Sequence, residues 1–353
     1  MNKNVSCRKL ILCLFSMALC QMLMCGCGSK AGDNTLAAVD QIEELDYETA
    51  LQTLDAATAA GENPAHIARA KGIALYGLTR YDEAITAYTE ALSYSDNYVD
   101  DFDFDVNYYM ADAYEAMGDF SQAADIYSAI IGLRGKDVLS YYRRGVNYLR
   151  TGQHDDALSD FNRALELRKD DYDLRIEIAG RLSDYGYEEE GVQFLSSFLS
   201  DNEKKLSAFD KGRIYFYMKD YDNAKLCLEE ARDDDNQNTI LFLGKTYEML
   251  GDYNYATSTY QNYLSKHPEA AVIYNQLGLS RLQSGDYAGA LDAFSTAKNI
   301  GNTGIEQTLA YNEIVANEYT GNFKQASVDM ETYLKKYPDD EAAQREYVFL
   351  SSR

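Results

Sequence analysis

Apolar side chains recur along the chain at helical spacing, and the segment 277–297 is the clearest example. Ala290, Phe294 and Ala297 are four and three residues apart, so they share one face of a helix. The preceding Gly-Asp-Tyr at 285–287 is a turn signal, because glycine can end one helix and aspartate can cap the next. The pattern therefore predicts two antiparallel helices joined by a tight turn.

The same pattern returns nine times. Three residues before the small position, seven of nine copies carry an aromatic residue, and four residues after it there is always a large apolar side chain. Small residues at this position, and at Gly278 in the preceding helix, predict a close crossing of the two helices. The small positions recur every 32 to 39 residues, at Ala50, Ala84, Ala123, Ala157, Gly191, Ala224, Ala256, Ala290 and Ala326.

A period near 34 residues with this arrangement resembles the tetratricopeptide repeat. The resemblance implies an all-α fold, a right-handed superhelical solenoid of about nine antiparallel helix pairs. We place the repeat array at 36–340 and a final helix that caps the exposed end at 341–353, since solenoids need polar ends.

Two places depart from the pattern. In the fifth repeat Gly191 replaces alanine and the aromatic Tyr187 is one position out of register, which predicts a helix offset or a hinge. In the ninth repeat Ile314 stands where the first helix otherwise has a small residue, so we expect that helix to pack differently.

Acidic residues outnumber basic ones, and the formal net charge is −24. Such a surface repels nucleic acid and anionic lipid headgroups, so we expect no nucleic-acid function. Residues 134–181 are the exception, with ten Lys or Arg and nine Asp or Glu, a balance of +1. The remainder holds 23 and 48, a balance of −25.

The first residues indicate export. Residues 1–26 have a positive start followed by a short apolar run, which is typical of a signal peptide and short for a spanning helix. Gly26 before Cys27 resembles the processing site of bacterial lipoproteins, which implies that Cys27 is lipidated (palmitate) and that 27–35 form a short tether. We therefore expect a lipid anchor in a membrane outside the cytoplasm, at the bacterial surface or in the periplasm. The alternative is an ordinary secretory signal cut near Gly28.

Signs of catalysis are weak. Cys227 would be the only cysteine beyond the tether and lacks a partner, so we interpret it as a packing residue. Neither His154 nor His267 has a second ligand at metal spacing, and no phosphate-binding or nucleophile motif occurs. We expect no enzyme activity, no cofactor or metal, and no small-molecule substrate.

The resemblance implies that the first helices of successive repeats line a concave groove that binds a protein partner. Aromatic and arginine side chains often dominate the energy of interfaces. The alternative is that the arginines of this region pair with acids such as Asp155 and Asp173, which would contribute little. The candidate peptide-binding residues in repeats four to six are Tyr142, Leu149, Arg150, Phe209, Arg213, Phe216 and Tyr217.

Two functions remain open. In the first, the chain is a membrane-anchored exported scaffold or adaptor, and its groove binds a peptide segment or helix of an envelope or secreted protein. In the second, it is a structural or assembly component of a cell-envelope complex that uses its convex face or its ends.

Overall fold

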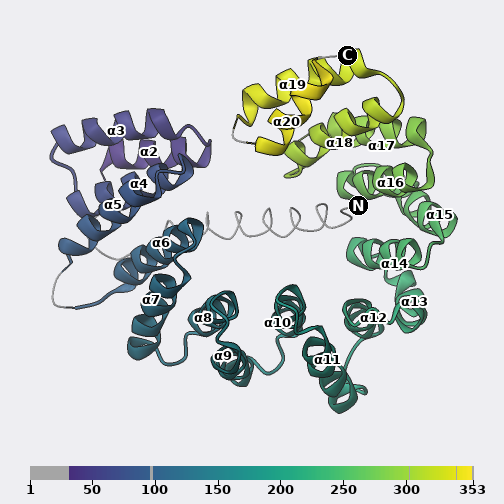
Figure 1. Ribbon diagram of the computed structural model, residues 1–353, viewed down its shortest axis with the longest axis horizontal. Coiled ribbons are helices and arrows are strands. Elements are labelled where there is room, and N and C mark those ends of the chain that lie inside the picture. The colour runs from purple at the N-terminus through teal and green to yellow at the C-terminus, as the bar shows by residue number, and fades with distance from the viewer. Residues whose placement is uncertain (1–31, 96–97, 302, 339, 352–353) are drawn as a thin grey trace. The chain divides into compact units, whose positions relative to one another are not determined.

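The computed structural model describes residues 32–95, 98–301, 303–338 and 340–351, and within these ranges every regular element is a helix (Figure 1). In these described ranges eighteen consecutive α-helices follow the nine predicted repeats in chain order, two to each repeat, and a further helix follows them. The predicted signal peptide and Cys27 lie outside the described residues. The chain divides into two compact units, with the boundary between Tyr187 and Glu188. This boundary separates the two helices of the fifth repeat.

The first unit contains four helix pairs and the first helix of the fifth. In each complete pair the two helices pack against each other. The helices are α2 (Asp33–Glu43), α3 (Tyr47–Ala59), α4 (Pro64–Gly77), α5 (Tyr81–Ser93), α6 (Asp101–Met117), α7 (Phe120–Leu133), α8 (Val138–Arg150), α9 (His154–Leu167) and α10 (Tyr172–Asp184).

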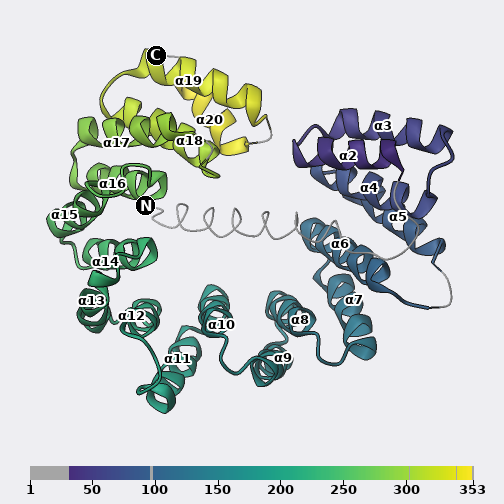
Figure 2. The same ribbon diagram turned by 180° about the vertical axis from the view of Figure 1, so that it is seen from behind.

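The second unit begins with the second helix of the fifth repeat and ends with the additional helix (Figure 2). A short 3₁₀ turn, η2 (Arg232–Asp234), follows the sixth pair. The helices are α11 (Glu188–Asn202), α12 (Ala208–Tyr217), α13 (Tyr221–Glu230), α14 (Gln237–Met249), α15 (Tyr253–Leu264), α16 (Ala271–Ser284), α17 (Tyr287–Ile300), α18 (Glu306–Tyr319), α19 (Phe323–Lys336) and α20 (Glu341–Leu350).

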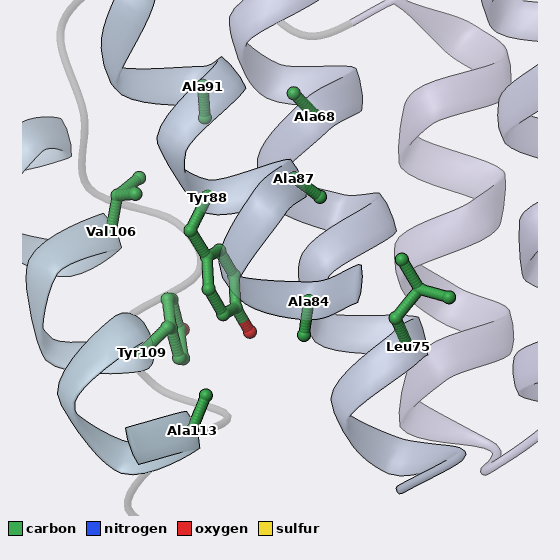
Figure 3. Packing of buried hydrophobic residues seen from close by; sticks show 9 residues of the cluster. All are labelled: Ala68, Leu75, Ala84, Ala87, Tyr88, Ala91, Val106, Tyr109 and Ala113. Carbon is green, nitrogen blue, oxygen red and sulfur yellow. The ribbon is translucent and has the colours of Figure 1, made fainter. Parts of the chain in front are cut away.

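The core repeats with the sequence. All nine small residues of the second helices are buried, and so are the large apolar residues that follow each by four positions. In the first unit, Tyr88 stacks on Tyr109 with ring centroids 6.0 Å apart, and Ala84 and Ala87 lie beside them (Figure 3). This cluster joins the second pair to the third, and similar clusters join other neighbouring pairs within each unit.

Close packing explains the glycines at the positions where the first helices cross the second helices. A Cβ added to Gly278 would lie 2.4 Å from the ring of Phe294, and one added to Gly244 would lie 2.1 Å from the ring of Tyr260. The large residue of each second helix therefore fills the space that the glycine leaves open. In the ninth pair Ile314 and Met330 are both buried, so a flexible methionine accommodates the larger residue on the first helix.

The aromatic residues at the turns connect neighbouring pairs. Phe120, which begins α7, lies beneath the guanidinium of Arg150 at the end of α8, 4.6 Å from its ring centroid. Tyr287, which begins α17, stacks on Tyr319 at the end of α18 with centroids 4.9 Å apart. At these two turns the aromatic residue of one pair thus covers the end of the first helix in the next.

The amino-terminal boundary differs from the prediction. Helix α2 begins at Asp33, so the last three residues of the predicted tether 27–35 are helical. The cause lies 28 residues away, because the carboxylate of Glu62 accepts hydrogen bonds from the backbone N–H groups of Asn34 (3.0 Å) and Thr35 (2.9 Å). These bonds satisfy donors at the start of the helix that its own residues leave free.

Candidate functional site

Within each unit, first helices of successive pairs lie next to one another. Helix α2 contacts α4, α4 contacts α6 and α8 contacts α10, while in the second unit α12 contacts α14, α14 contacts α16 and α16 contacts α18 (Figure 1). We call the surface that these helices form in a unit its first-helix face. All seven candidate binding residues lie on first helices, three in the first unit and four in the second.

In the first unit, the prediction that Tyr142 and Leu149 face an open groove is wrong. Tyr142 is only 4% exposed and Leu149 only 5%. The Tyr142 hydroxyl donates to Oε1 of Glu177 at 2.7 Å and accepts from Nε of Arg181 at 3.2 Å. Burial raises the pKa of Tyr142. Helix α10 therefore covers the tyrosine, which acts as a link between two helices.

Arg150 lies partly exposed but is engaged by its own unit. Its Nε donates to the hydroxyl of Tyr185 at 3.1 Å, and its Nη1 donates to Oε2 of Glu115 at 3.3 Å. Its guanidinium also covers Phe120. These contacts tie α8 to α6, α7 and α10, and they account for the arginine without a partner protein.

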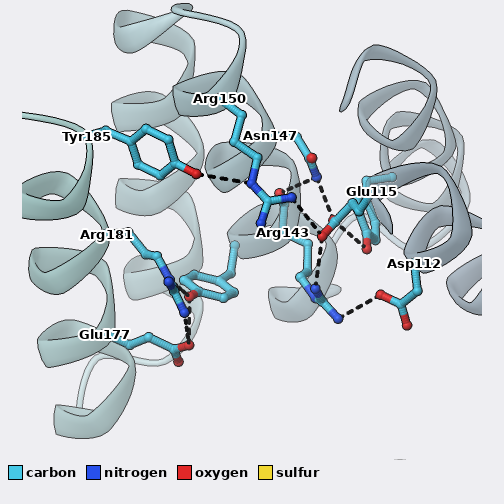
Figure 4. Close-up of polar contacts among 10 residues, drawn as sticks. Asp112, Glu115, Arg143, Asn147, Arg150, Glu177, Arg181 and Tyr185 are labelled. Carbon is cyan, nitrogen blue, oxygen red and sulfur yellow. Dashed lines mark hydrogen bonds and ion pairs between the residues drawn. The ribbon is translucent and has the colours of Figure 1, made fainter. Parts of the chain in front are cut away.

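Glu115 is the centre of a polar network on α6 and α8 (Figure 4). Besides Arg150, its carboxylate accepts from Nη1 of Arg143 (3.3 Å) and Nδ2 of Asn147 (2.8 Å). Arg143 also donates to Asp112 at 2.8 Å. Burial raises the pKa of Asp112 to about 6, and the charge of Arg143 opposes that rise.

Several arginines of residues 134–181 thus pair with acids of the chain itself, which was the alternative interpretation of this basic segment. Arg143, Arg144 and Arg150 all form ion pairs with carboxylates of their own unit. The acids are Asp112, Glu115 and Asp160 rather than the sequence neighbours that we expected. These pairs are largely buried and hold the arginines within the stack of helices, so the arginines do not form a receptive basic strip.

In the second unit the structure brings the four predicted residues together. The ring of Phe216 lies 5.7 Å from that of Tyr217, and the guanidinium of Arg213 lies 5.3 Å from the ring of Phe209. Tyr217 is 43% exposed, whereas Phe209, Arg213 and Phe216 are half-buried. This arrangement leaves a surface of mixed aromatic and cationic character on α12.

Phe242 of α14 completes this group, and the sequence analysis missed it. Its ring lies 5.4 Å from Phe216, 5.9 Å from Tyr217 and 6.1 Å from Phe209, and Arg213 lies 5.5 Å above it. A half-buried aromatic on a first helix, outside the positions that pack each pair, was the available signal. We call Phe209, Arg213, Phe216, Tyr217 and Phe242 the aromatic cluster.

Local sequence explains how α12 presents these residues. Ser207 begins the helix, since its hydroxyl accepts from the backbone N–H of Asp210 at 3.0 Å. A Cβ at Gly212 would lie 2.5 Å from Leu228, so α12 packs tightly on α13 through its other face. Positions 209, 213 and 216 are four and three residues apart, and they share the face turned towards α14.

Other candidate chemistry is sparse. Among the described residues no group of three or more His, Cys, Asp or Glu is arranged to hold a metal ion. The thiol of Cys227 is free and half-buried, and burial raises its pKa, which disfavours the reactive thiolate. In the part of the chain that the structure describes, every helix is too short or too polar to cross a bilayer.

Models of the tetratricopeptide repeat family match residues 35–98, 105–133, 138–171, 207–231 and 241–304. Among curated proteins, the chain is 30% identical over 127 residues to the BBSome complex member BBS4 of Bos taurus. That match covers 36% of this chain and only 23% of the relative.

Solved structures with similar folds include three from different sources. Yeast Tom70 is 15% identical with a TM-score of 0.48, covering 90% of this chain and 80% of that one. A tetratricopeptide repeat protein from Parabacteroides merdae is 14% identical with a TM-score of 0.42, covering 71% and 99%. MamA from Desulfovibrio magneticus is 16% identical with a TM-score of 0.40, covering 50% and 100%.

Proposed function

Because the chain belongs to the tetratricopeptide repeat family, we propose that it is a membrane-anchored, exported scaffold that binds a protein partner on a first-helix face. The partner contributes a peptide segment or a helix, and it is an envelope or secreted protein. Proteins of this family generally act by binding other proteins, which supports the scaffold role.

The aromatic cluster is the observation that carries the proposal. Buried aromatic anchors surrounded by partly exposed contacts are the usual source of binding energy in protein interfaces. Tyr217 supplies an exposed ring beside the half-buried Phe216 and Phe242. In the first unit, by contrast, Tyr142 and Arg150 are committed to contacts within the fold. We therefore propose that the main partner-binding surface lies in the second unit.

The proposed lipid anchor and the proposed location of the protein outside the cytoplasm rest on the sequence. A positive start, a short apolar run and the pair Gly26-Cys27 support export and lipidation of Cys27. Lipidation with two acyl chains would suffice for stable attachment to a membrane. The described residues supply no spanning helix, so in this proposal the lipid holds the protein at the membrane.

The test is affinity purification of the full chain from detergent-solubilised membranes of its own source. We expect envelope or secreted proteins to co-purify, and the double substitution Phe216→Ala with Phe242→Ala to remove them. The matched control is Leu226→Ala on α13, which removes an apolar side chain that is 65% exposed. Equal recovery with the double variant and with the control, at unchanged helix content, would place the binding surface elsewhere.

One observation favours the second function, a structural role in an envelope complex. Helix α20 buries Ala343 and Leu350 against α18 and α19, but it leaves Val348 70% exposed. An exposed apolar side chain on a terminal helix can serve as a contact surface for another protein. If Val348→Glu removes the co-purified proteins while the aromatic-cluster variant retains them, this second function replaces the first.

A further inference from the structure

We infer that helix α20 receives an amphipathic helix from a partner protein, and that this helix completes a tenth pair by lying antiparallel on the open face of α20. The inference rests on the second function given above and specifies the chemistry of the partner. It comes from the place of Val348 in the repeat pattern and from the side chains that cover this place in earlier copies.

Helix α20 has the burial pattern of a first helix. We call the place of the small residue in each first helix the crossing position. A buried residue lies five positions before it and another lies two positions after it, as Ile273 and Ser280 do in α16. In α20 the two buried residues are Ala343 and Leu350, also seven positions apart, so Val348 occupies the crossing position. The other clear examples are Ile67 and Ala74 in α4, Val106 and Ala113 in α6, Ser140 and Asn147 in α8, Thr239 and Thr246 in α14, and Leu309 and Ala316 in α18.

In the last two pairs of the array the second helix covers the crossing position. A Cβ on Gly278 of α16 would lie 2.4 Å from the ring of Phe294 on α17. Ile314 of α18 is buried in one cluster with Met330 of α19. Val348, in contrast, is 70% exposed, and among the described residues no helix follows α20. The open face of α20 is therefore the one that a second helix covers in these earlier copies.

The residues around Val348 define what a partner helix must offer. The exposed side chains of α20 recur at helical spacing and form one stripe, which consists of Glu341, Gln344, Arg345, Val348 and Phe349. Its first half is polar, because Glu341 and Arg345 form an exposed ion pair at 3.4 Å. Its second half is apolar. A helix that lies along this stripe therefore needs an apolar face over Val348 and polar residues over the ion pair.

The branched side chain of Val348 also limits which apolar residue can lie against it. Rings pack only against small crossing residues, since even a Cβ on Gly244 would lie 2.1 Å from the ring of Tyr260. The ninth pair has a branched residue at the crossing position, Ile314, and there the second helix carries Met330. We therefore expect the partner helix to carry a flexible residue such as methionine over Val348, in place of an aromatic ring.

Helix α19 supplies the probe, because its sequence already suits a branched crossing residue. The test measures the fluorescence anisotropy of labelled synthetic peptides with the full chain in detergent. The first peptide has the sequence of residues 322–336, the second carries Ala326→Lys and Met330→Lys, and the third carries Met330→Phe. We expect saturable binding of the first peptide and roughly tenfold or more weaker binding of the second, since a lysine would place a charge in an apolar contact. The third should bind more weakly than the first.

Substitutions in the full chain then locate the peptide. Val348→Glu should weaken the first peptide by roughly tenfold or more, while Val328→Glu, the same change at an exposed valine of α19, should leave its affinity within about twofold. Exchange of the peptide for α19 at Ile314 would not respond to Val348→Glu, so the variant separates the two sites.

A second variant tests the packing directly and keeps the helix uncharged. Val348→Ala restores a small crossing residue, as at Ala111, which is buried in one cluster with Tyr127. The Met330→Phe peptide should then bind more tightly than the first peptide, which reverses the order found with the wild type. Unchanged helix content by circular dichroism is required of every variant, and Val348→Ala remains informative if Val348→Glu loses helix.

Three results would overturn the inference: no binding of the first peptide, equal binding of the lysine peptide, or equal loss with Val348→Glu and Val328→Glu. These failures are distinguishable from failure of the second function. If the peptides do not bind but Val348→Glu still removes the co-purified proteins from membranes, α20 is a contact surface and only the helical class of partner is wrong.

Discussion

At the residue scale, the repeat depends on a fixed pairing between a small residue and a large one sixteen positions later. Gly72 faces Tyr88, Gly145 faces Phe161 and Gly278 faces Phe294, and in each case a Cβ on the glycine would approach the ring to 2.7 Å or less. A contact of that kind forces the ring or the helix to move. These three glycines are therefore required by packing and not by backbone conformation.

This pairing predicts opposite effects for two glycines in helices α8 and α10 of the first unit. Gly145→Ala should lower the free energy of unfolding by about 1–3 kcal/mol, because its Cβ would meet Phe161 at 2.7 Å. Gly180→Ala should raise it by about 0.5–1 kcal/mol, since no atom lies within 4 Å and alanine favours the helix. Urea unfolding followed by circular dichroism would measure both. Equal effects of the two substitutions would contradict this pairing.

The sequence predicted these packing residues because they recur. Ala50, Ala157 and Ala290 could be aligned across copies, and their burial in the structure confirms the frame. Phe242 had no such support, because its role depends on Arg213 and Phe216 of the preceding first helix. Contacts between helix faces in successive repeats follow from the rotation of one pair against the next, which the spacing of residues within a single copy does not encode.

At the element scale, buried polar contacts hold consecutive first helices together. Glu115 of α6 accepts from Arg143, Asn147 and Arg150 of α8, while Tyr142 of α8 links to α10. Repeat arrays have only contacts between neighbours, so each such junction limits the stability of the stack. The sequence showed the individual charges of this network, but the burial that makes them structural became visible only in three dimensions.

Removal of the central carboxylate should be costly. Glu115→Ala would leave Arg150 without its carboxylate partner and Arg143 with Asp112 alone, and we expect a loss of about 3–5 kcal/mol in the free energy of unfolding. Glu166→Ala breaks the exposed pair with Arg163 and should cost at most about 1 kcal/mol. Urea unfolding of both variants provides the comparison, and similar losses would show that the network contributes no more than a surface ion pair.

The packing of the carboxyl-terminal helix α20 against α18 should depend on pH. Burial, together with the charge of Glu346 on α20, raises the pKa of Glu318 on α18 to about 7. The same acids, Glu318 and Glu346, also raise the pKa of the nearby Tyr311, after the larger effect of burial and together with Asp340. A glutamate in the unfolded chain has a pKa near 4.3, so the folded state holds this proton more tightly. Stability from this group is therefore present at low pH and is lost as the pH rises from about 4.5 through 7.

The prediction is that Tm falls between pH 5 and pH 8, and that Glu318→Gln reduces the fall. Glu331→Gln on α19 removes an exposed carboxylate and should leave the pH dependence unchanged. Thermal unfolding at several pH values would test both variants. An identical pH dependence in the wild type and Glu318→Gln would show that this carboxyl pair does not control the docking of α20.

At the scale of the whole molecule, the sequence predicted the all-α repeat fold from nine weak motifs in register. The division into two compact units falls inside the fifth repeat, where Gly191 and Tyr187 depart from the pattern. The basic balance of residues 134–181 was misleading, because a count of charges does not distinguish a receptive surface from a set of internal pairs. The binding surface proposed here therefore lies in the unit with the less conspicuous charge pattern.

The proposed anchor predicts the fate of the whole chain. Wild-type protein should be recovered with membranes and released only by detergent, whereas Cys27→Ser should be released without detergent or should accumulate as precursor with residues 1–26 attached. Cys227→Ser is the matched control and should fractionate as the wild type does. Membrane fractionation with immunoblotting and mass measurement gives the result. Wild-type protein found free in the medium would contradict the anchor.

The Glu62 contacts have a mechanical consequence. If the chain is attached to a membrane at Cys27, a pulling force from a bound partner acts first on the start of α2. There Asn34 and Thr35 donate hydrogen bonds to Glu62. These hydrogen bonds lower the pKa of Glu62 to about 2, so the carboxylate stays ionised and keeps accepting them in mildly acidic solution. Glu62 lies beyond α3, and the load therefore passes to the far end of the first helix pair. In this geometry the pair resists peeling as one block instead of unravelling from its first turn.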